Sequence, residues 1–103
     1  MEKSKIYLVL TQSFYRTLDG IDHAAPVNPS HILLFEDKVK AKKYAEQLSK
    51  SWVENFKCTL SQEDPKKLAK EAKSIHTILL NQQIGSSSWR TYIHVFENHL
   101  MDF

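Results

Sequence analysis

"HILLFEDKVKAKKYAEQLSKSWVENFK", residues 31–57, carries the two strongest local signals in the chain of 103 residues. Its first five residues, His31–Phe35, form a short apolar run of strand length, which predicts a β-strand. Asp37 then suits a helix N-cap, because its carboxylate can accept hydrogen bonds from the free N–H groups of a first turn. After Asp37, apolar residues recur at helical spacing, namely Ala41, Tyr44, Ala45, Leu48, Trp52 and Phe56. We therefore expect a strand followed by a helix over about residues 38–57.

Two further strands are expected, one towards each end of the chain. Lys5–Thr11, "KIYLVLT", is short, apolar and rich in β-forming residues, and Trp89–Phe96, "WRTYIHVF", has the same character. Between the first strand and His31 lie residues 12–30, "QSFYRTLDGIDHAAPVNPS", which we interpret as a long loop. A loop of this length in a small domain is more often functional than a plain spacer.

A second helix is expected over about residues 62–81. Ser61 to Asp64 has the S-x-x-[DE] form of a helix start, and Pro65 is tolerated in a first turn. Leu68, Ala72, Ile75 and Leu79 then give an apolar stripe at helical spacing. The end of this helix stays open, because residues 74–80, "SIHTILL", are rich in β-branched residues and could form a strand instead.

These elements predict one α+β domain over residues 1–103, with the order β-β-α-α-β. We expect a small three-stranded sheet with two helices packed on one face. No apolar run approaches the roughly 18 residues that cross a bilayer, so a membrane is not expected as a partner. A lone Cys58 cannot form an intramolecular disulfide, which favours a reducing, cytoplasmic location.

Most common catalytic motifs are absent from the sequence. Gly20 and Gly85 are its only glycines, so neither a P-loop nor a dinucleotide-binding fingerprint can be written. One cysteine excludes a paired-cysteine zinc site, and we expect no cofactor and no metal. A small enzyme is the least favoured of the three functions considered for this chain. In one version Asp22 orients His23 as a general base. In another, His23 and His31 share a metal ion with a carboxylate.

The favoured interpretation is a non-catalytic protein that binds another macromolecule, most readily a protein. Aromatic residues and arginine dominate interface energies, and the expected loop holds Phe14, Tyr15 and Arg16 together. Trp89 and Arg90 are further candidate anchors, as are Met101 and Phe103 in the tail. The alternative is that the loop only covers the end of the sheet. An uncovered sheet face or edge strand also leaves homodimer formation open.

Nucleic acid is the second candidate partner, because lysines are concentrated in the two helices. Residues 38–73 hold ten lysines against five acidic residues, whereas residues 17–37 hold four acidic residues and neither lysine nor arginine. Lys40 and Lys43 of the first helix could contact phosphates. However, the chain has only two arginines, Arg16 and Arg90, and base recognition favours arginine.

Three segments carry a resemblance to a known group of proteins: "YLV" at residues 7–9, "ILLFEDKVKAKKYAEQL" at 32–48 and "YIHVFE" at 92–97. The chain resembles short, uncharacterised proteins of bacteria, phages and plasmids, in which a strand pair leads into an F-x-[DS]-x-x-x-A-x-x-Y helix and another strand closes the domain. Here Phe35, Asp37, Ala41 and Tyr44 occupy the motif. The group includes inhibitors of host nucleases such as anti-CRISPR proteins. The resemblance therefore implies a modulator or inhibitor of a host macromolecule, with a nuclease as one candidate target.

Overall fold

A computed structural model describes residues 5–26 and 31–99 of the chain. This part forms an α+β fold with two helices and one antiparallel sheet of six strands. The strands and helices, in chain order, are β1 (Lys5–Arg16), β2 (Asp22–Ala24), β3 (Ile32–Phe35), α1 (Lys38–Phe56), β4 (Thr59–Leu60), α2 (Pro65–Ala72), β5 (His76–Ile84) and β6 (Ser87–His99).

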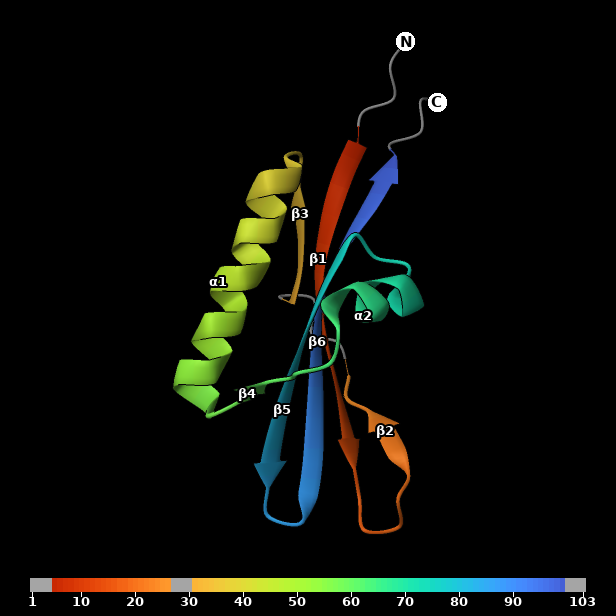
Figure 1. The fold of residues 1–103 in the computed structure, drawn as a ribbon, viewed down its shortest axis with the longest axis vertical. Coiled ribbons are helices and arrows are strands. Elements are labelled where there is room, and N and C mark those ends of the chain that lie inside the picture. Colours follow the sequence, from red (N-terminus) through yellow and green to blue (C-terminus); the bar gives the residue numbers. More distant parts are fainter. Residues whose placement is uncertain (1–4, 27–30, 100–103) are drawn as a thin grey trace.

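The sheet is built around a long ladder between β1 and β6, which pairs from Lys5 opposite His99 to Arg16 opposite Ser88. The strand order is β2-β1-β6-β5-β4, and β3 also pairs with β1, beside its first half. β2 occupies the same edge of β1 near Arg16. The molecule is elongated, with principal extents of 53 × 26 × 26 Å, and the strands run along its long axis (Figure 1).

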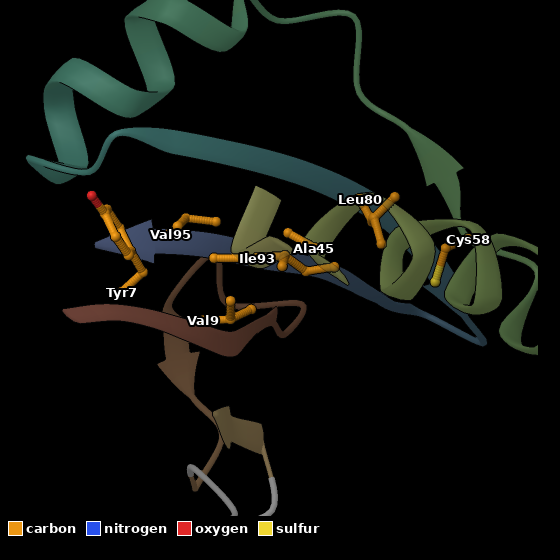
Figure 2. Close-up of a cluster of buried hydrophobic side chains, with 8 residues drawn as sticks. Tyr7, Val9, Ala45, Cys58, Leu80, Ile93 and Val95 are labelled. Atoms are coloured by element: carbon orange, nitrogen blue, oxygen red, sulfur yellow. The ribbon is translucent and has the colours of Figure 1, made fainter. Parts of the chain in front are cut away.

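α1 covers one face of the sheet and forms the core with it. Alternate residues of a strand point to opposite faces, and one set packs under the helix, where Ala41 and Ala45 are fully buried. The core cluster consists of Tyr7, Val9, Ala41, Ala45, Cys58, Leu80, Ile93 and Val95 (Figure 2). Small alanines on α1 allow the helix to approach the strands closely, while the larger Tyr44, Leu48 and Trp52 pack around the edge of the cluster.

α2 lies on the other side of the sheet, which corrects the expectation of two helices on one face. Leu68 of α2 lines the same hollow as Tyr92 and His94 of β6, whose side chains point away from the core. Figure 1 shows α1 and α2 on opposite sides of the strands. Because α2 has only eight residues, it leaves much of this second face uncovered.

The expected three-stranded sheet is therefore wrong, and so is the order β-β-α-α-β. The helix over residues 38–57 is confirmed, with Asp37 as its N-cap: its carboxylate accepts from the backbone N–H groups of Val39 and Lys40. The expected strands at residues 5–11, 31–35 and 89–96 are also present, although β1 and β6 are longer than expected.

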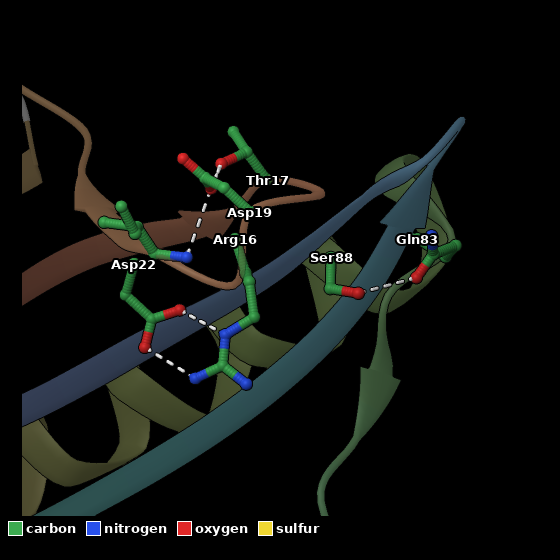
Figure 3. Close-up of polar contacts among 7 residues, drawn as sticks. Arg16, Thr17, Asp19, Asp22, Gln83 and Ser88 are labelled. Carbon is green, nitrogen blue, oxygen red and sulfur yellow. Dashed lines mark hydrogen bonds and ion pairs between the residues drawn. The ribbon is translucent and has the colours of Figure 1, made fainter.

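Residues 12–30 are not simply a loop. β1 continues to Arg16, the chain turns over residues 17–21, and β2 returns along β1. Thr17 closes this turn, because its carbonyl oxygen accepts from Gly20 N–H and its own N–H donates to the Ile21 carbonyl. Gly20 has a φ of 78°, which a residue with a Cβ rarely adopts. Asp19 accepts hydrogen bonds from the Thr17 hydroxyl and the Ile21 N–H (Figure 3).

The second helix ends at Ala72 rather than near Asn81. The helix begins at Pro65 with Asp64 as its N-cap, three residues later than the expected start near residue 62, and Pro65 lies in the first turn as expected. At its end Lys73 adopts a left-handed conformation, and the N–H groups of Lys73 and Ser74 close the last turn on the carbonyls of Lys70 and Ala69. Residues 76–84 then form β5, so the strand alternative for residues 74–80 is the one that holds for most of that segment.

Within the described ranges, no helix combines the length and hydropathy needed to span a bilayer.

Candidate functional site

The candidate anchors of the expected loop and those of the last strand meet on neighbouring strands at one end of the sheet. Phe14 lies opposite Arg90, Tyr15 opposite Trp89 and Arg16 opposite Ser88. We call this region the aromatic end and define it by six residues: Phe14, Tyr15, His23, Trp89, Arg90 and Tyr92. Their side chains divide between the two faces, because neighbouring residues in a strand point in opposite directions.

A row of three aromatic rings in contact crosses β2, β1 and β6 on the face that carries α1. The ring of Tyr15 lies 5.1 Å from that of His23, nearly parallel to it, and 5.1 Å from that of Trp89. All three side chains are half-buried. The row therefore offers a rigid aromatic surface that still reaches the solvent.

On the opposite face, Phe14 and Arg90 both contact Tyr92. Phe14 meets the Tyr92 ring edge-on at 5.8 Å, and the Arg90 guanidinium lies 5.7 Å from the centre of that ring. These residues border a hollow of about 550 Å³, which is also lined by Leu68 and His94. A hollow with aromatic walls and a few polar groups suits an apolar or aromatic side chain of a partner.

Both arginines are already paired with carboxylates of the same chain. Arg16 binds Asp22 with two hydrogen bonds, from Nε at 2.7 Å and from a terminal nitrogen at 2.9 Å (Figure 3). Arg90 donates to Glu63 at 2.8 Å. The hydrogen bonds from Arg16 hold the pKa of Asp22 below its usual value. The carboxylate of Asp22 and the guanidinium of Arg16 are therefore both charged near neutral pH. A phosphate would have to compete with these carboxylates for either guanidinium.

His94 lines the hollow and is held by Thr77. The Thr77 hydroxyl and the His94 Nδ1 are 2.8 Å apart, and the imidazole stacks on Tyr92 at 5.5 Å. Burial lowers the pKa of His94 below its ordinary value. The ring is therefore neutral at pH 7 and serves as part of the wall of the hollow.

The suggested catalytic pair of Asp22 and His23 is not brought together. Asp22 pairs with Arg16 on one face of the β1–β2 hairpin, whereas His23 stacks on Tyr15 on the other. Across residues 5–26 and 31–99, no group of three or more histidine, cysteine, aspartate or glutamate side chains is placed to hold a metal ion. Cys58 is buried in the core, where burial raises the pKa of its thiol, which favours the less reactive protonated form.

Lys40 and Lys43 lie on α1 and not at the aromatic end. Both are exposed, and neither forms an ion pair with a described residue. The lysines of α2 lie across the sheet from α1, so the two lysine-rich helices do not join into one surface. Met101 and Phe103, the tail anchors considered from the sequence, lie outside the described residues.

Tyr92, His94 and Leu68 are site residues that the sequence interpretation missed. A signal for two of them was available: in "WRTYIHVF" the residues Arg90, Tyr92, His94 and Phe96 alternate with Trp89, Thr91, Ile93 and Val95, so one face of this strand is aromatic. Leu68 could not be placed beside them, because the second helix was expected on the other face.

Comparison of the chain with protein-family models, with curated proteins and with solved structures finds no match.

Proposed function

We propose that the chain is a non-catalytic binding protein that holds a protein partner at its aromatic end and thereby modulates that partner. One observation carries the proposal: Phe14, Tyr15, Trp89 and Arg90, which are distant in sequence, lie together with their rings partly exposed. Tryptophan, tyrosine and arginine are the residues most enriched at the energetic centres of protein interfaces.

The charge at the aromatic end favours a protein over a nucleic acid. Because Arg16 is paired with Asp22 and Arg90 with Glu63, the charges of both arginines are balanced locally. The partner surface we expect is therefore apolar or aromatic and nearly uncharged. The resemblance to small phage and plasmid proteins makes a host nuclease the first class of partner to test, and inhibition of that nuclease the first activity. The proposed setting is the cytoplasm, where the lone Cys58 would stay reduced.

Nucleic-acid binding is the second candidate. It is favoured by Lys40 and Lys43, which are exposed and in no ion pair with a described residue. An accessory protein that binds through these lysines would lose affinity steeply as salt is raised, because phosphate contacts release counterions.

The experiment that tests the proposal is affinity capture from host lysate, with and without nuclease treatment, read by mass spectrometry. Three chains are compared: the wild type, Trp89→Ala, and Lys40→Glu combined with Lys43→Glu. A protein captured in stoichiometric amount after nuclease treatment, lost with Trp89→Ala and kept with the lysine variant, supports the proposal. Capture that needs nucleic acid and the two lysines would replace it with the second candidate.

A further inference from the structure

β3 is an edge strand without the features that normally protect an edge. It pairs with β1 on one side, and on its other side no strand is present among the described residues. Its sequence, Ile-Leu-Leu-Phe, has no charge and no proline, and the exposed fractions of Ile32, Leu33 and Leu34 are 41%, 38% and 63%. Exposed edges of this kind pair readily with another chain, and natural proteins usually block them with lysine, proline or a bulge.

The free backbone groups of this edge can be assigned from the pairing. Ser13 accepts a hydrogen bond from Ala25 N–H, so the odd-numbered residues of β1 direct their backbone groups towards β2 and β3. Leu33 lies opposite Val9, and Phe35 opposite Tyr7, so these two residues of β3 bond to β1. The backbone N–H and C=O groups of Ile32 and Leu34 therefore face the open edge.

We propose that two copies of the chain pair through β3 in antiparallel orientation, with Leu34 opposite Leu34 of the other copy on the two-fold axis. This register places the outward backbone groups of Leu34 against the same groups of the other copy. It also places Ile32 opposite the partner's Glu36. The side chain of Leu34, the most exposed in the strand, then meets its own copy on the face opposite α1.

The carboxylates that follow β3 favour this orientation and a second copy as the occupant. His31 precedes the strand, and Glu36 and Asp37 follow it. Antiparallel pairing brings His31 of each copy to the end that carries the partner's Glu36 and Asp37, whereas a parallel arrangement would place the four carboxylates together. The centre of the contact is apolar and uncharged in both copies, so an identical strand complements it without an unpaired charge.

The expected dimer is weak because the contact is short. Stable interfaces bury about 800 Å² on each partner, and a four-residue strand buries less than this. We expect a dissociation constant between about 1 μM and about 1 mM, which corresponds to roughly 8 to 4 kcal/mol. Because β3 lies beside residues 7–10 of β1, whereas the aromatic end includes residues 14 and 15 of that strand, the dimer leaves the proposed partner site free.

Sedimentation velocity across this concentration range tests the proposal. Leu34→Lys places a charge on the edge without touching the core and is expected to weaken the dimer at least tenfold. Leu60→Lys is the matched control, because the exposed fraction of Leu60 is 59% and the residue lies on β4, at the far side of the sheet. A wild type that stays monomeric up to about 1 mM, or a dimer lost with Leu60→Lys and kept with Leu34→Lys, would overturn it.

Disulfide trapping tests the register and separates edge pairing from other contacts of Leu34. In a hydrogen-bonded antiparallel pair the Cα atoms are about 5.5 Å apart, which a disulfide can bridge. Leu34→Cys is expected to form a covalent dimer under mild oxidation much faster than Leu60→Cys, while the wild type, whose Cys58 is buried, stays monomeric on a non-reducing gel. Equal rates for the two variants would contradict the register. Loss of partner binding in the capture experiment leaves this inference unaffected, since it depends on neither Trp89 nor the lysines.

Discussion

Tyr15 of β1 and Trp89 of β6 lie directly opposite each other in the sheet, with their ring centres 5.1 Å apart and their planes inclined by 34°. This contact joins two candidate anchors that the sequence placed in separate segments. It also gives each ring a fixed orientation, which reduces the entropy that a partner would have to overcome on binding. The proposed function depends on this fixed orientation of the rings. The contribution of Tyr15 to partner binding can be separated from its contribution to stability by experiment.

Tyr15→Ala should weaken partner binding at least tenfold while the protein stays folded. The variant loses the contacts with Trp89 and His23, and aromatic pairs contribute about 0.5–1.5 kcal/mol each beyond their buried area. The two contacts together correspond to about 1–3 kcal/mol, so a fall in melting temperature of roughly 4–24 °C is expected for a domain of this size. Calorimetric titration with the captured partner and a thermal melt measure the two effects.

Leu18→Ala is the control for this prediction, because Leu18 is in the turn between β1 and β2 and its exposed fraction is 87%. We expect it to leave both affinity and melting temperature unchanged. If Tyr15→Ala abolishes cooperative unfolding, the aromatic end is structural cover and not a binding surface.

Ile93→Ala should be the more damaging of two matched core and surface substitutions. Ile93 is fully buried between α1 and the sheet, so its truncation leaves a cavity and should lower the free energy of unfolding by about 2–5 kcal/mol. Ile84→Ala, at the exposed end of β5, should change it by less than about 1 kcal/mol. Urea titration followed by circular dichroism compares them. Similar midpoints for the two variants would contradict the placement of the core.

Stability should fall as the pH is lowered through the range below about 6.5, the ordinary histidine pKa. Burial lowers the pKa of both His94 and His76 in the folded chain. Since the unfolded chain binds protons at a higher pH than the folded one, protonation favours unfolding, and stability is lost as the pH falls from the unfolded pKa towards the folded pKa. Urea midpoints measured from pH 8 to pH 5 test the direction.

The variant His94→Gln should reduce this pH dependence while His76 maintains part of it. Asn98→Ala, which alters an exposed residue near the end of β6 that carries no titratable group, serves as the control and should leave the slope unchanged. A wild type whose stability is flat from pH 8 to pH 5 would show that neither buried imidazole is desolvated as described.

Arg16 and Asp22 should couple weakly. Their side chains are about half exposed, so a double-mutant cycle with Arg16→Ala and Asp22→Ala should give a small favourable coupling at low salt that falls as salt is raised. The cycle is measured by urea unfolding. A coupling that does not respond to salt would mean that the pair is more buried than its geometry indicates.

The parts of the fold that could be predicted are those in which local and tertiary preferences agree. Asp37 and the apolar stripe after it predict the first and last residues of α1 to within about one residue. The β-rich runs predict the positions of β1, β3 and β6 but not their full lengths. The segment 12–30 was misjudged because its residues do not alternate between polar and apolar: Ser13 and Tyr15 face α1, and Phe14 and Arg16 face away, so each face carries one polar and one apolar side chain. Asp19-Gly20 in the turn is a hairpin signal, but without alternation in the flanking residues it does not distinguish a hairpin from a loop.

The second helix shows a different kind of failure. Leu68, Ala72, Ile75 and Leu79 fit helical spacing, yet the chain leaves the helix after Ala72. The β-branched residues Thr77 and Ile78 gain more as part of a strand that pairs with β6. Because this error removed a strand and moved the helix to the wrong face, the hollow beside Tyr92 could not be foreseen, although four of the seven candidate site residues gather at the aromatic end and Arg16 lies next to it.

The long ladder between β1 and β6 has a consequence for how the chain folds. Ser13 and Thr91, whose hydroxyls are 2.8 Å apart across this ladder, are separated by 78 positions in sequence. During synthesis, β1 therefore leaves the ribosome long before the strand that completes its pairing. Its apolar face stays exposed to solvent until α1 and β6 have been synthesised. Proteins dominated by such distant contacts fold slowly. While the chain is incomplete, the exposed β1 can bind a chaperone or associate with other unfolded chains.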